Sequence, residues 1–344
     1  MTQPFRVLQV GCGGISNAWL EPATSNPDVT IVGLVDLNTD TAQKQADAFG
    51  FDAYVGSDLG NAIAQTQPDI VFNCTIPAAH FEVTTQALEA GAHVISEKPL
   101  ADTMQQARDM LDATQKTGRT LAVMQNRRYN PNVRLIREVI ASGVLGELTT
   151  VNADFYIAAH FEGFRLDMPN VLIKDMAIHT FDAARYFTGA NAHAVYCYEW
   201  NPKASPYTTG AAAQAIFEMD DGIVFNYRGS WVSEGCHTPW ESAWRIVGTE
   251  GSLTWDGALE LKSDVVAKRG GFFSDFRQPD LPTLQESDMM GWHGLTIDAF
   301  CKALAAGQTP ETHAADNIHS LAMVFAAIES ANKRERITFD WQTL

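Results

Sequence analysis

Residues 5–16 decide the fold: the run Phe5-Arg-Val-Leu-Gln-Val10 is followed at once by Gly11-Cys-Gly-Gly-Ile-Ser16. The first six residues read as a strand, and a helix is expected from Ile15 to Thr24. A glycine-rich turn between a strand and a helix is the context of the dinucleotide-binding fingerprint. Gly11 permits the tight turn, and Gly13 lets the backbone approach a pyrophosphate at the helix N-terminus. The third fingerprint position holds Ser16 in place of glycine or alanine.

An acidic residue follows at the distance that this fingerprint requires. Asp36 ends the second expected strand, 25 positions after Gly11. A carboxylate there accepts hydrogen bonds from the adenosine ribose hydroxyls and repels a 2′-phosphate. Leu37 and Asn38 come next, with no Arg or Lys to pair such a phosphate, so the sequence favours NAD over NADP. The alternative is a generic glycine turn with Asp36 capping a loop.

Strand-like and helical segments alternate outward from this motif to about residue 125. The strands are continuous apolar runs, as expected of strands covered on both faces, so the pattern predicts a parallel sheet with right-handed crossovers. The expected strands are Phe5–Val10, Thr30–Val35, Ile70–Asn73, His93–Ser96 and Thr120–Met124, and the helices that follow are 15–24, 40–49, 79–90 and 104–117.

The pattern changes after about residue 126, and we expect two domains, residues 1–125 and 126–344. In Ile223–Tyr227 apolar side chains alternate with polar or smaller ones, and Asp220-Asp221-Gly222 before it is a hairpin signal, which indicates a mainly antiparallel sheet with one covered face. The expected elements are strands over 148–157, 194–199, 211–218, 223–231, 242–247 and 252–255, and helices over 170–187, 291–306 and 314–332.

Composition narrows the function classes. With 24 Lys and Arg against 41 Asp and Glu, the net charge is −17, which disfavours binding to nucleic acids and to anionic membranes. No apolar run approaches the length of a membrane span, and no signal-peptide pattern is found at the N-terminus. The five cysteines are widely spaced and lack a Cys-x-x-Cys motif. Reduced thiols and a cytoplasmic protein are therefore expected.

Glu97-Lys98-Pro99 follows the expected strand His93–Ser96, at the edge of the sheet where open α/β proteins bind ligands. A lysine there can donate to a substrate hydroxyl or stabilise a developing alkoxide. Pro99 could hold the turn through a cis peptide bond. The alternative is a surface lysine before a proline that starts a helix.

The helix expected over residues 170–187 carries Asp175, His179 and Asp182 at spacings that place them on one face. A histidine with a carboxylate one turn away is a candidate general base. The alternative is a capping aspartate and a packed core histidine. No metal site is expected, because no third ligand lies nearby in the sequence and there is no His-Glu-x-x-His motif.

Taken together, these residues resemble the glucose–fructose oxidoreductase, inositol dehydrogenase and MocA family, abbreviated Gfo/Idh/MocA. The resemblance covers essentially the whole chain. It rests on four segments in order: Val10-Gly11-Cys12-Gly13-Gly14-Ile15, Thr75-Ile76-Pro77 with His80, Glu97-Lys98-Pro99, and Asp175-Met-Ala-Ile-His179. It implies a Rossmann domain followed by an α/β domain on a large open antiparallel sheet.

The resemblance also implies roles for individual residues. Lys98 would contact the reacting hydroxyl and the nicotinamide region, Asp175 would orient substrate and base, and His179 would take the hydroxyl proton. Glu97 would bond the nicotinamide ribose, and Gln125 would lie near the nicotinamide. The remaining implied cofactor-binding residues are Gly11, Gly13, Gly14, Ile15, Asp36, Thr75, Pro77 and His80. One departure is the bulky Pro169–Lys174 segment, where family members often carry glycines.

The expected activity is transfer of a hydride between a secondary hydroxyl of a sugar, sugar derivative or cyclitol and NAD. The alternatives are an NAD-retaining, redox-assisted glycoside hydrolase and a non-catalytic NAD-binding sensor. Candidate substrate-binding residues are Arg128, Arg165, Lys174 and Trp240, which suit sugar hydroxyls or an acidic group. The alternative for the tryptophan is sheet-face packing or a subunit interface. Apolar outward positions on an open sheet predict a homodimer or homotetramer.

Overall fold

The computed structural model describes residues 3–286 and 291–344. Its contacts divide the chain into two compact units, each made of two stretches of sequence. The first unit comprises Met1–Tyr129 and Asp288–Leu321, and the second comprises Asn130–Ser287 and Ala322–Leu344. The last division falls inside helix α9 (Ala314–Lys333). No helix in the described residues is both long and apolar enough to cross a membrane.

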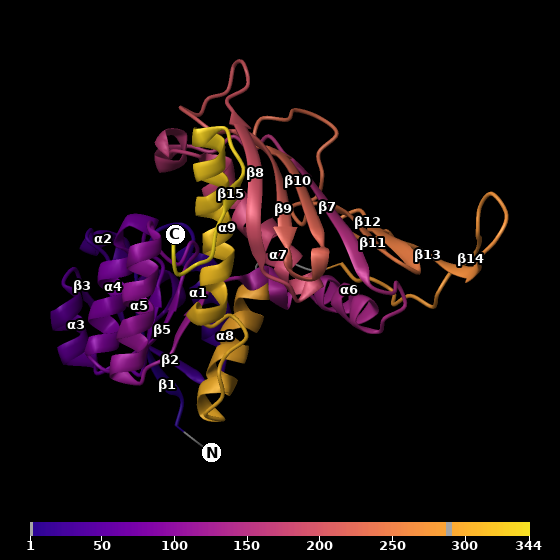
Figure 1. Cartoon of the computed structure of the whole chain (residues 1–344). Coiled ribbons are helices and arrows are strands. Elements are labelled where there is room, and N and C mark those ends of the chain that lie inside the picture. Colours follow the sequence, from indigo (N-terminus) through magenta and orange to yellow (C-terminus); the bar gives the residue numbers. More distant parts are fainter. Residues whose placement is uncertain (1–2, 287–290) are drawn as a thin grey trace. The chain divides into compact units, whose positions relative to one another are not determined.

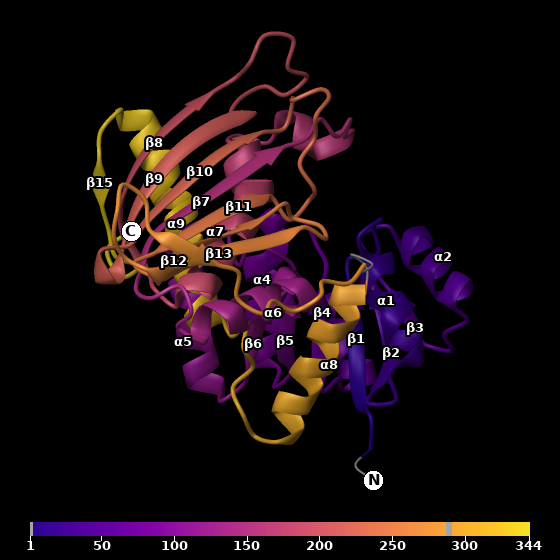
Figure 2. The same cartoon turned by 90° about the vertical axis from the view of Figure 1, so that its right-hand side faces the viewer.

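Within the described residues, the first unit is built on a six-stranded sheet in the order β3-β2-β1-β4-β5-β6. Figure 1 shows strands of this sheet in indigo to purple, and the order can be followed by the labels in Figure 2. Every neighbouring pair is parallel, so the predicted doubly wound parallel sheet is confirmed. The strands are β1 (Phe5–Val10), β2 (Val29–Val35), β3 (Tyr54–Gly56), β4 (Ile70–Asn73), β5 (His93–Ser96) and β6 (Leu121–Val123). Strand β3 was not predicted, because three residues carry no readable period.

Helices cover the sheet in two groups. Contacts join α1 to α2 and α8, and α4 to α3 and α5. Side chains of α8 enter the core of this unit, where Ile297 and Phe300 pack with Trp19 of α1. The helices are α1 (Ser16–Ser25), α2 (Thr39–Phe49), α3 (Leu59–Thr66), α4 (Pro77–Glu89), α5 (Met104–Thr117) and α8 (Gly291–Ala305). The first unit therefore depends on a helix that lies more than 160 residues further along the chain than β6.

The second unit is built on a nine-stranded sheet in the order β14-β13-β12-β11-β7-β10-β9-β8-β15, counted over the described residues (Figure 2). Its pairs are antiparallel except for β10 with β7, which run parallel, so the expectation of a mainly antiparallel sheet is confirmed. The strands are β7 (Leu148–Tyr156), β8 (Ala192–Trp200), β9 (Ala212–Met219), β10 (Val224–Ser230), β11 (Ala243–Gly248), β12 (Gly251–Trp255), β13 (Leu261–Lys268), β14 (Asp275–Arg277) and β15 (Ile337–Thr338).

One face of this sheet is covered by α7 (Ile178–Thr188), which lies behind the strands in Figure 2. The Phe181 ring packs edge-on against Phe217 at 4.8 Å and Tyr227 at 5.3 Å between ring centroids. Ile223, Phe225 and Tyr227 are all buried, as their alternation predicts. The sheet thus gives α7 a rigid aromatic base.

The approach to α7 differs from the uniform helix predicted from residue 170. Leu172–Ala177 is a π-helical turn, and α6 (Pro131–Ala141) precedes it in the chain. Asn170 adopts a left-handed φ of 55°, and the Leu172 amide, which has no helical partner at the start of this segment, donates to the Gly210 carbonyl at 3.1 Å. A π turn is wider than an α turn and occurs frequently at functional sites. Asp175 lies within this turn, whereas His179 lies in the first turn of α7.

Candidate functional site

The glycine loop of the first unit leaves its backbone open to a ligand. Gly11 has a φ of +84°, and a Cβ at that position would lie 2.6 Å from the Cys74 carbonyl oxygen, so only glycine fits. No described atom lies within 4 Å of the places where Gly13 or Gly14 would carry a Cβ. The Ser16 hydroxyl donates to the Gly13 carbonyl at 2.6 Å, which satisfies the serine that replaces the third glycine.

Asp36 is held in position by the loop it faces. Its Oδ2 accepts the Cys12 amide and its Oδ1 accepts the Asn38 amide, both at 2.9 Å. Burial, reinforced by the Asp36 charge, raises the pKa of the Cys12 thiol to about 12, so the loop carries no thiolate. Next to the carboxylate, Leu37 is 96% exposed. These features fit an adenosine ribose bound at the end of β2.

Thr75 and Pro77 follow β4, beside the glycine loop. The Thr75 hydroxyl donates to Asn73 Oδ1 at 2.6 Å, and Pro77 is the first residue of α4. Between them Ile76 is 56% exposed, and Ile15 across the loop is 46% exposed. Exposed apolar side chains beside an open glycine loop suit the flat faces of a dinucleotide.

His80 has no exposed surface, and its ring joins two loops of the first unit. Nδ1 lies 2.7 Å from the Pro99 carbonyl oxygen, and Nε2 lies 3.0 Å from the Thr75 carbonyl oxygen. Both partners are acceptors, whereas a neutral imidazole has a single N–H, so the ring donates to one at a time. Burial lowers the pKa of His80, although both carbonyls act in the opposite direction. The structure thus shows His80 as a buried link between the Thr75 and Pro99 loops.

The turn that carries Lys98 begins directly after β5. The Lys98–Pro99 peptide bond is cis, as predicted, and the Lys98 amide donates to Glu97 Oε2 at 3.1 Å. The Glu97 carboxylate itself is buried, at 7% exposure. Lys98 thus lies at the C-terminal edge of the parallel sheet. Its turn is held by the Glu97 carboxylate before it and by the contact of His80 with the Pro99 carbonyl after it.

Gln125 follows β6 and is 1% exposed. Neither its Nε2 nor its Oε1 has a hydrogen-bond partner among the described residues. A buried amide with both polar atoms unpaired is rare, because each unpaired group loses the hydrogen bonds it makes in water. This orphaned amide fits a bound polar group such as a carboxamide at the edge of the sheet.

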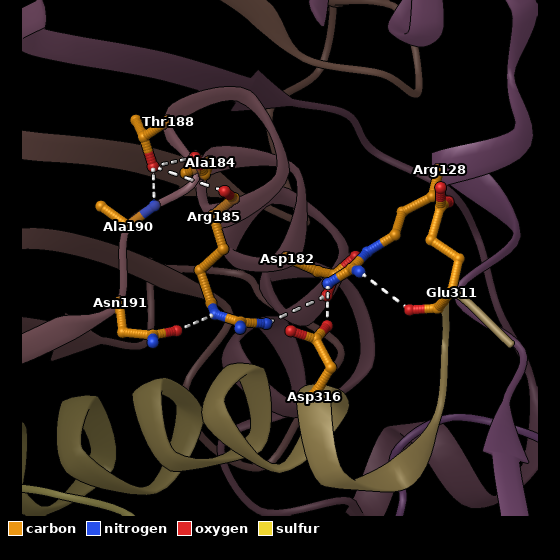
Figure 3. A network of polar contacts seen from close by, with 9 residues as sticks. All are labelled: Arg128, Asp182, Ala184, Arg185, Thr188, Ala190, Asn191, Glu311 and Asp316. Atoms are coloured by element: carbon orange, nitrogen blue, oxygen red, sulfur yellow. Dashed lines mark hydrogen bonds and ion pairs between the residues drawn. The ribbon is translucent and has the colours of Figure 1, made fainter. Parts of the chain in front are cut away.

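Arg128 lies in the short helical turn Asn126–Tyr129 of the first unit and is 6% exposed (Figure 3). Its Nη2 is 2.7 Å from Asp316 Oδ2, and its Nη1 donates to the Glu311 carbonyl at 3.3 Å. The guanidinium therefore ties this turn to the beginning of α9. Figure 3 also shows Asp182 of the second unit, whose Oδ1 lies 3.8 Å from Arg185 Nη1.

In the second unit, Arg165 and Asp175 are brought together. The Arg165 Nε donates to Asp175 Oδ2 at 2.8 Å, and its Nη2 lies 3.4 Å from Oδ1. The guanidinium also sits 4.8 Å from the ring centroids of both Phe161 and Phe164. A two-point contact with the carboxylate and two neighbouring aromatic rings together restrict the orientation of the guanidinium. His179, 8% exposed, follows on the first turn of α7.

The other two candidate substrate residues have aromatic neighbours. Trp240 packs on Trp231 with ring centroids 5.8 Å apart, and Phe161, which contacts Arg165, packs on Trp231 from 5.3 Å. Lys174 Nζ lies 5.9 Å from the Phe325 ring. The structure therefore gathers Arg165 and Trp240 around one aromatic cluster and gives Lys174 a different neighbour.

Some residues near these sites carry no sequence signal. Tyr207 is 3% exposed and donates to the Ala159 carbonyl at 3.2 Å; burial raises its pKa, reinforced by the charge of Asp175 and opposed by Arg165. In the first unit, Trp19 and His293 approach the Glu97 carboxylate. Within residues 3–286 and 291–344, no group of three His, Cys, Asp or Glu side chains is arranged to hold a metal ion.

Comparison with protein-family models identifies both parts of the chain. Residues 5–125 match the model described as an oxidoreductase family with an NAD-binding Rossmann fold. Residues 133–254 match the Gfo/Idh/MocA C-terminal domain, so the two matches cover well over half of the chain. The chain belongs to the Gfo/Idh/MocA family. The resemblance inferred from sequence is confirmed, and the first domain is an NAD-binding Rossmann domain of an oxidoreductase.

Relatives within this Gfo/Idh/MocA family include several proteins named for sugars. The chain is 32% identical to the D-glucoside 3-dehydrogenase of Escherichia coli over 56% of its length and 58% of that enzyme. It is 23% identical to the 1,5-anhydro-D-fructose reductase of Ensifer adhaerens over 94% of its length and 95% of that enzyme. It is also 27% identical to y4oX of Sinorhizobium fredii, over 95% of this chain and 93% of that protein.

Solved structures of similar fold cover almost the whole chain. An oxidoreductase from Agrobacterium radiobacter, solved with NAD+, L-tartaric acid and magnesium, superposes with a TM-score of 0.85 at 19% identity, over 98% of each chain. Levoglucosan dehydrogenase, solved with NADH and levoglucosan, superposes with a TM-score of 0.84 at 21% identity, over 98% of this chain and 99% of that one. At these identities the likeness concerns the fold.

Burial of His80 predicts a pH-dependent stability. Because its folded pKa is lowered, the unfolded chain takes up a proton below the ordinary value of about 6.5 before the folded protein does, and stability falls as the pH drops from there. His80→Gln removes this titrating group. In urea unfolding between about pH 7.5 and about pH 5.5, the slope of its free energy of unfolding against pH should therefore be smaller than that of the wild type by up to about 1.4 kcal/mol per pH unit. His237→Gln, in an exposed loop, is the control. A slope in His80→Gln equal to that of the wild type would contradict the lowered pKa of His80 in the folded protein.

Proposed function

We propose that this protein is an NAD-dependent oxidoreductase that transfers a hydride between a secondary hydroxyl carbon of a sugar, sugar derivative or cyclitol and the nicotinamide. The observation that supports NAD as the cofactor is the orientation of Asp36, whose two oxygens are fixed by the amides of Cys12 and Asn38. Support for the substrate class comes from relatives that are named for D-glucosides, 1,5-anhydro-D-fructose and levoglucosan.

The open glycine loop supports assignment of the pyrophosphate to the Gly11–Ile15 segment, at the N-terminus of α1. Thr75 and Pro77, which follow β4, and the orphaned amide of Gln125, which follows β6, belong to the same proposed cofactor site. The bound nicotinamide would supply the hydride acceptor or donor. Glu97 and Lys98 are assigned to its end of the cofactor, because β5 ends beside β4 and β6.

Lys98 and His179 are proposed as the catalytic residues. Lys98 would stabilise negative charge on the substrate oxygen, and His179 would remove the hydroxyl proton in the oxidation direction. Asp175 is proposed to orient base and substrate. Its two-point contact with Arg165 supports this role, because a carboxylate held in one plane presents its remaining lone pairs in fixed directions.

On the substrate side, Arg165 and Trp240 are the better-supported candidates, since both belong to the aromatic cluster near Asp175. A sugar ring can stack on such a cluster while its hydroxyls meet the guanidinium edge. Lys174 lies near Phe325, and Arg128 is ion-paired with Asp316. We therefore assign Arg128 to holding the turn after β6 and Lys174 to the periphery of the substrate region.

A second copy of this chain is proposed to cover the open face of the nine-stranded sheet. This face carries a hollow of about 810 Å³, with Tyr196 and Tyr198 on one side and the Asp154–Arg228 ion pair on the other. Tyr196 and Tyr198 are each nearly half exposed. A patch that combines aromatic rings with charges of both signs can be complementary to itself across a two-fold axis.

The catalytic assignment predicts separate effects on turnover and on cofactor binding. Lys98→Ala and His179→Ala should each lower kcat by about 10²–10⁴-fold while NAD still binds. The assay follows reduced cofactor with neutral sugars, sugar acids and inositols as substrates, and exposed Lys116→Ala and His237→Ala serve as controls. Wild-type turnover in both variants would contradict the assignment. Release of a chromogenic aglycone with retained NAD and no net NADH would indicate the glycosidase instead.

Asp36→Ala tests the choice of dinucleotide. Loss of the carboxylate should weaken NAD binding by about tenfold, because hydrogen bonds to a charged acceptor are lost, and should narrow the preference over NADP. Fluorescence titration with NADH and NADPH gives both affinities. Asp40→Ala, on the first turn of α2, is the matched control. A wild-type preference for NADP would contradict the proposal.

Tyr198→Asp tests the proposed interface, since a charge buried between two copies lacks a partner. We expect light scattering at micromolar concentration to show an oligomer for the wild type and a smaller species for Tyr198→Asp. Lys116→Asp, an exposed change in the first unit, should leave the mass unchanged. A monomeric wild type would contradict this part of the proposal.

A further inference from the structure

The Glu97 carboxylate is surrounded by donors from distant parts of the first unit. Trp19 Nε1, on α1, donates to Glu97 Oε1 at 2.9 Å, and the Lys98 amide donates to Oε2. His293 Nε2, on α8, lies 3.8 Å from Oε1. These three groups come from sequence positions almost 300 residues apart, although all belong to one compact unit. These contacts restrict the orientation of Glu97, the residue next to Lys98.

The orientation of the His293 ring follows from its second contact. Asn126 Nδ2, in the turn after β6, lies 3.2 Å from His293 Nδ1. An amide nitrogen can only donate, so in this pairing Nδ1 accepts and the ring proton of neutral His293 is on Nε2, the nitrogen that faces Glu97. The ring is also enclosed, at 8% exposure, with its centroid 6.4 Å from that of Trp19.

The electrostatics of Glu97 agree with this geometry. Burial raises the pKa of Glu97, but the nearby His293 ring, the charge of Lys98 and the Trp19 N–H together lower it below its ordinary value. A buried carboxylate remains ionised only while such donors are present. Removing one of them leaves Glu97 free to take up a proton or to rotate, and the Lys98 amide then loses its fixed acceptor.

We propose that His293, supported by Asn126 and acting with Trp19, is a positioning residue that holds Glu97 and the Lys98 turn in the orientation needed to bind the nicotinamide half of the cofactor. This inference rests on the proposed function. It adds to that function a residue from the far end of the sequence that does not touch substrate or cofactor and acts through Glu97.

The test compares two ligands that differ at one end. NAD carries the nicotinamide riboside, and ADP lacks it. Isothermal titration of His293→Leu should show NAD binding weakened by about tenfold, because the buried Glu97 carboxylate loses a polar neighbour, with ADP binding within about twofold of wild type. Trp19→Phe, which keeps the ring and removes one N–H, should show the same selective loss. His293→Gln, which can place an N–H near the same position, should recover most of the affinity.

His93, on the strand that leads to Glu97, provides a matched control. His93 begins β5, at the end opposite Glu97, and its Nδ1 accepts the Thr120 amide at 3.0 Å. His93→Leu should leave the ratio of NAD to ADP affinity unchanged. Equal weakening of both ligands in His293→Leu and Trp19→Phe, or no weakening of either, would overturn the positioning role. If the wild-type protein binds neither ligand, the proposed function itself is wrong, whatever the variants show.

Discussion

The first unit must keep a negative charge buried at the end of β5, because Glu97 is 7% exposed and adjoins Lys98. An isolated carboxylate in such a place loses the hydration that stabilises it in water. The structure compensates with an indole N–H from α1, a backbone amide from the turn itself and an imidazole from α8. The return of the chain to this unit through α8 therefore completes the surroundings of Glu97 as well as the apolar core.

The two units orient their polar groups by different means. In the first, side chains are fixed against backbone atoms: Asp36 binds two amides, and His80 lies between two carbonyls. In the second, Arg165 is fixed by aromatic rings and in turn fixes Asp175. Backbone partners tolerate changes of sequence elsewhere, whereas a cation–π contact depends on the identity of its rings. We expect substitutions near the second arrangement to change specificity more readily than those near the first.

The sequence predicted those features that depend on neighbouring residues. Phe5–Val10, Ile70–Asn73 and His93–Ser96 were placed to the residue, because buried parallel strands are short continuous apolar runs, which give a distinct local pattern. The π turn at Leu172–Ala177 was not predicted; its first amide donates to the Gly210 carbonyl, almost 40 residues away, and no local period records such a contact. The parallel pairing of β7 with β10, and the approach of His293 to Glu97, also involve long-range contacts that no local period records.

The discontinuity of the first unit has a consequence during synthesis. Its six strands are complete at Val123, but the α8 side chains Ile297, Phe300 and Cys301 that join its core are translated far later. At about 5–20 residues per second, the ribosome needs on the order of ten seconds or more to add the intervening chain. During that interval the nascent domain exposes the apolar surface that α8 later covers. A chaperone that shields this surface on the emerging polypeptide would raise the yield of native protein without altering the finished molecule.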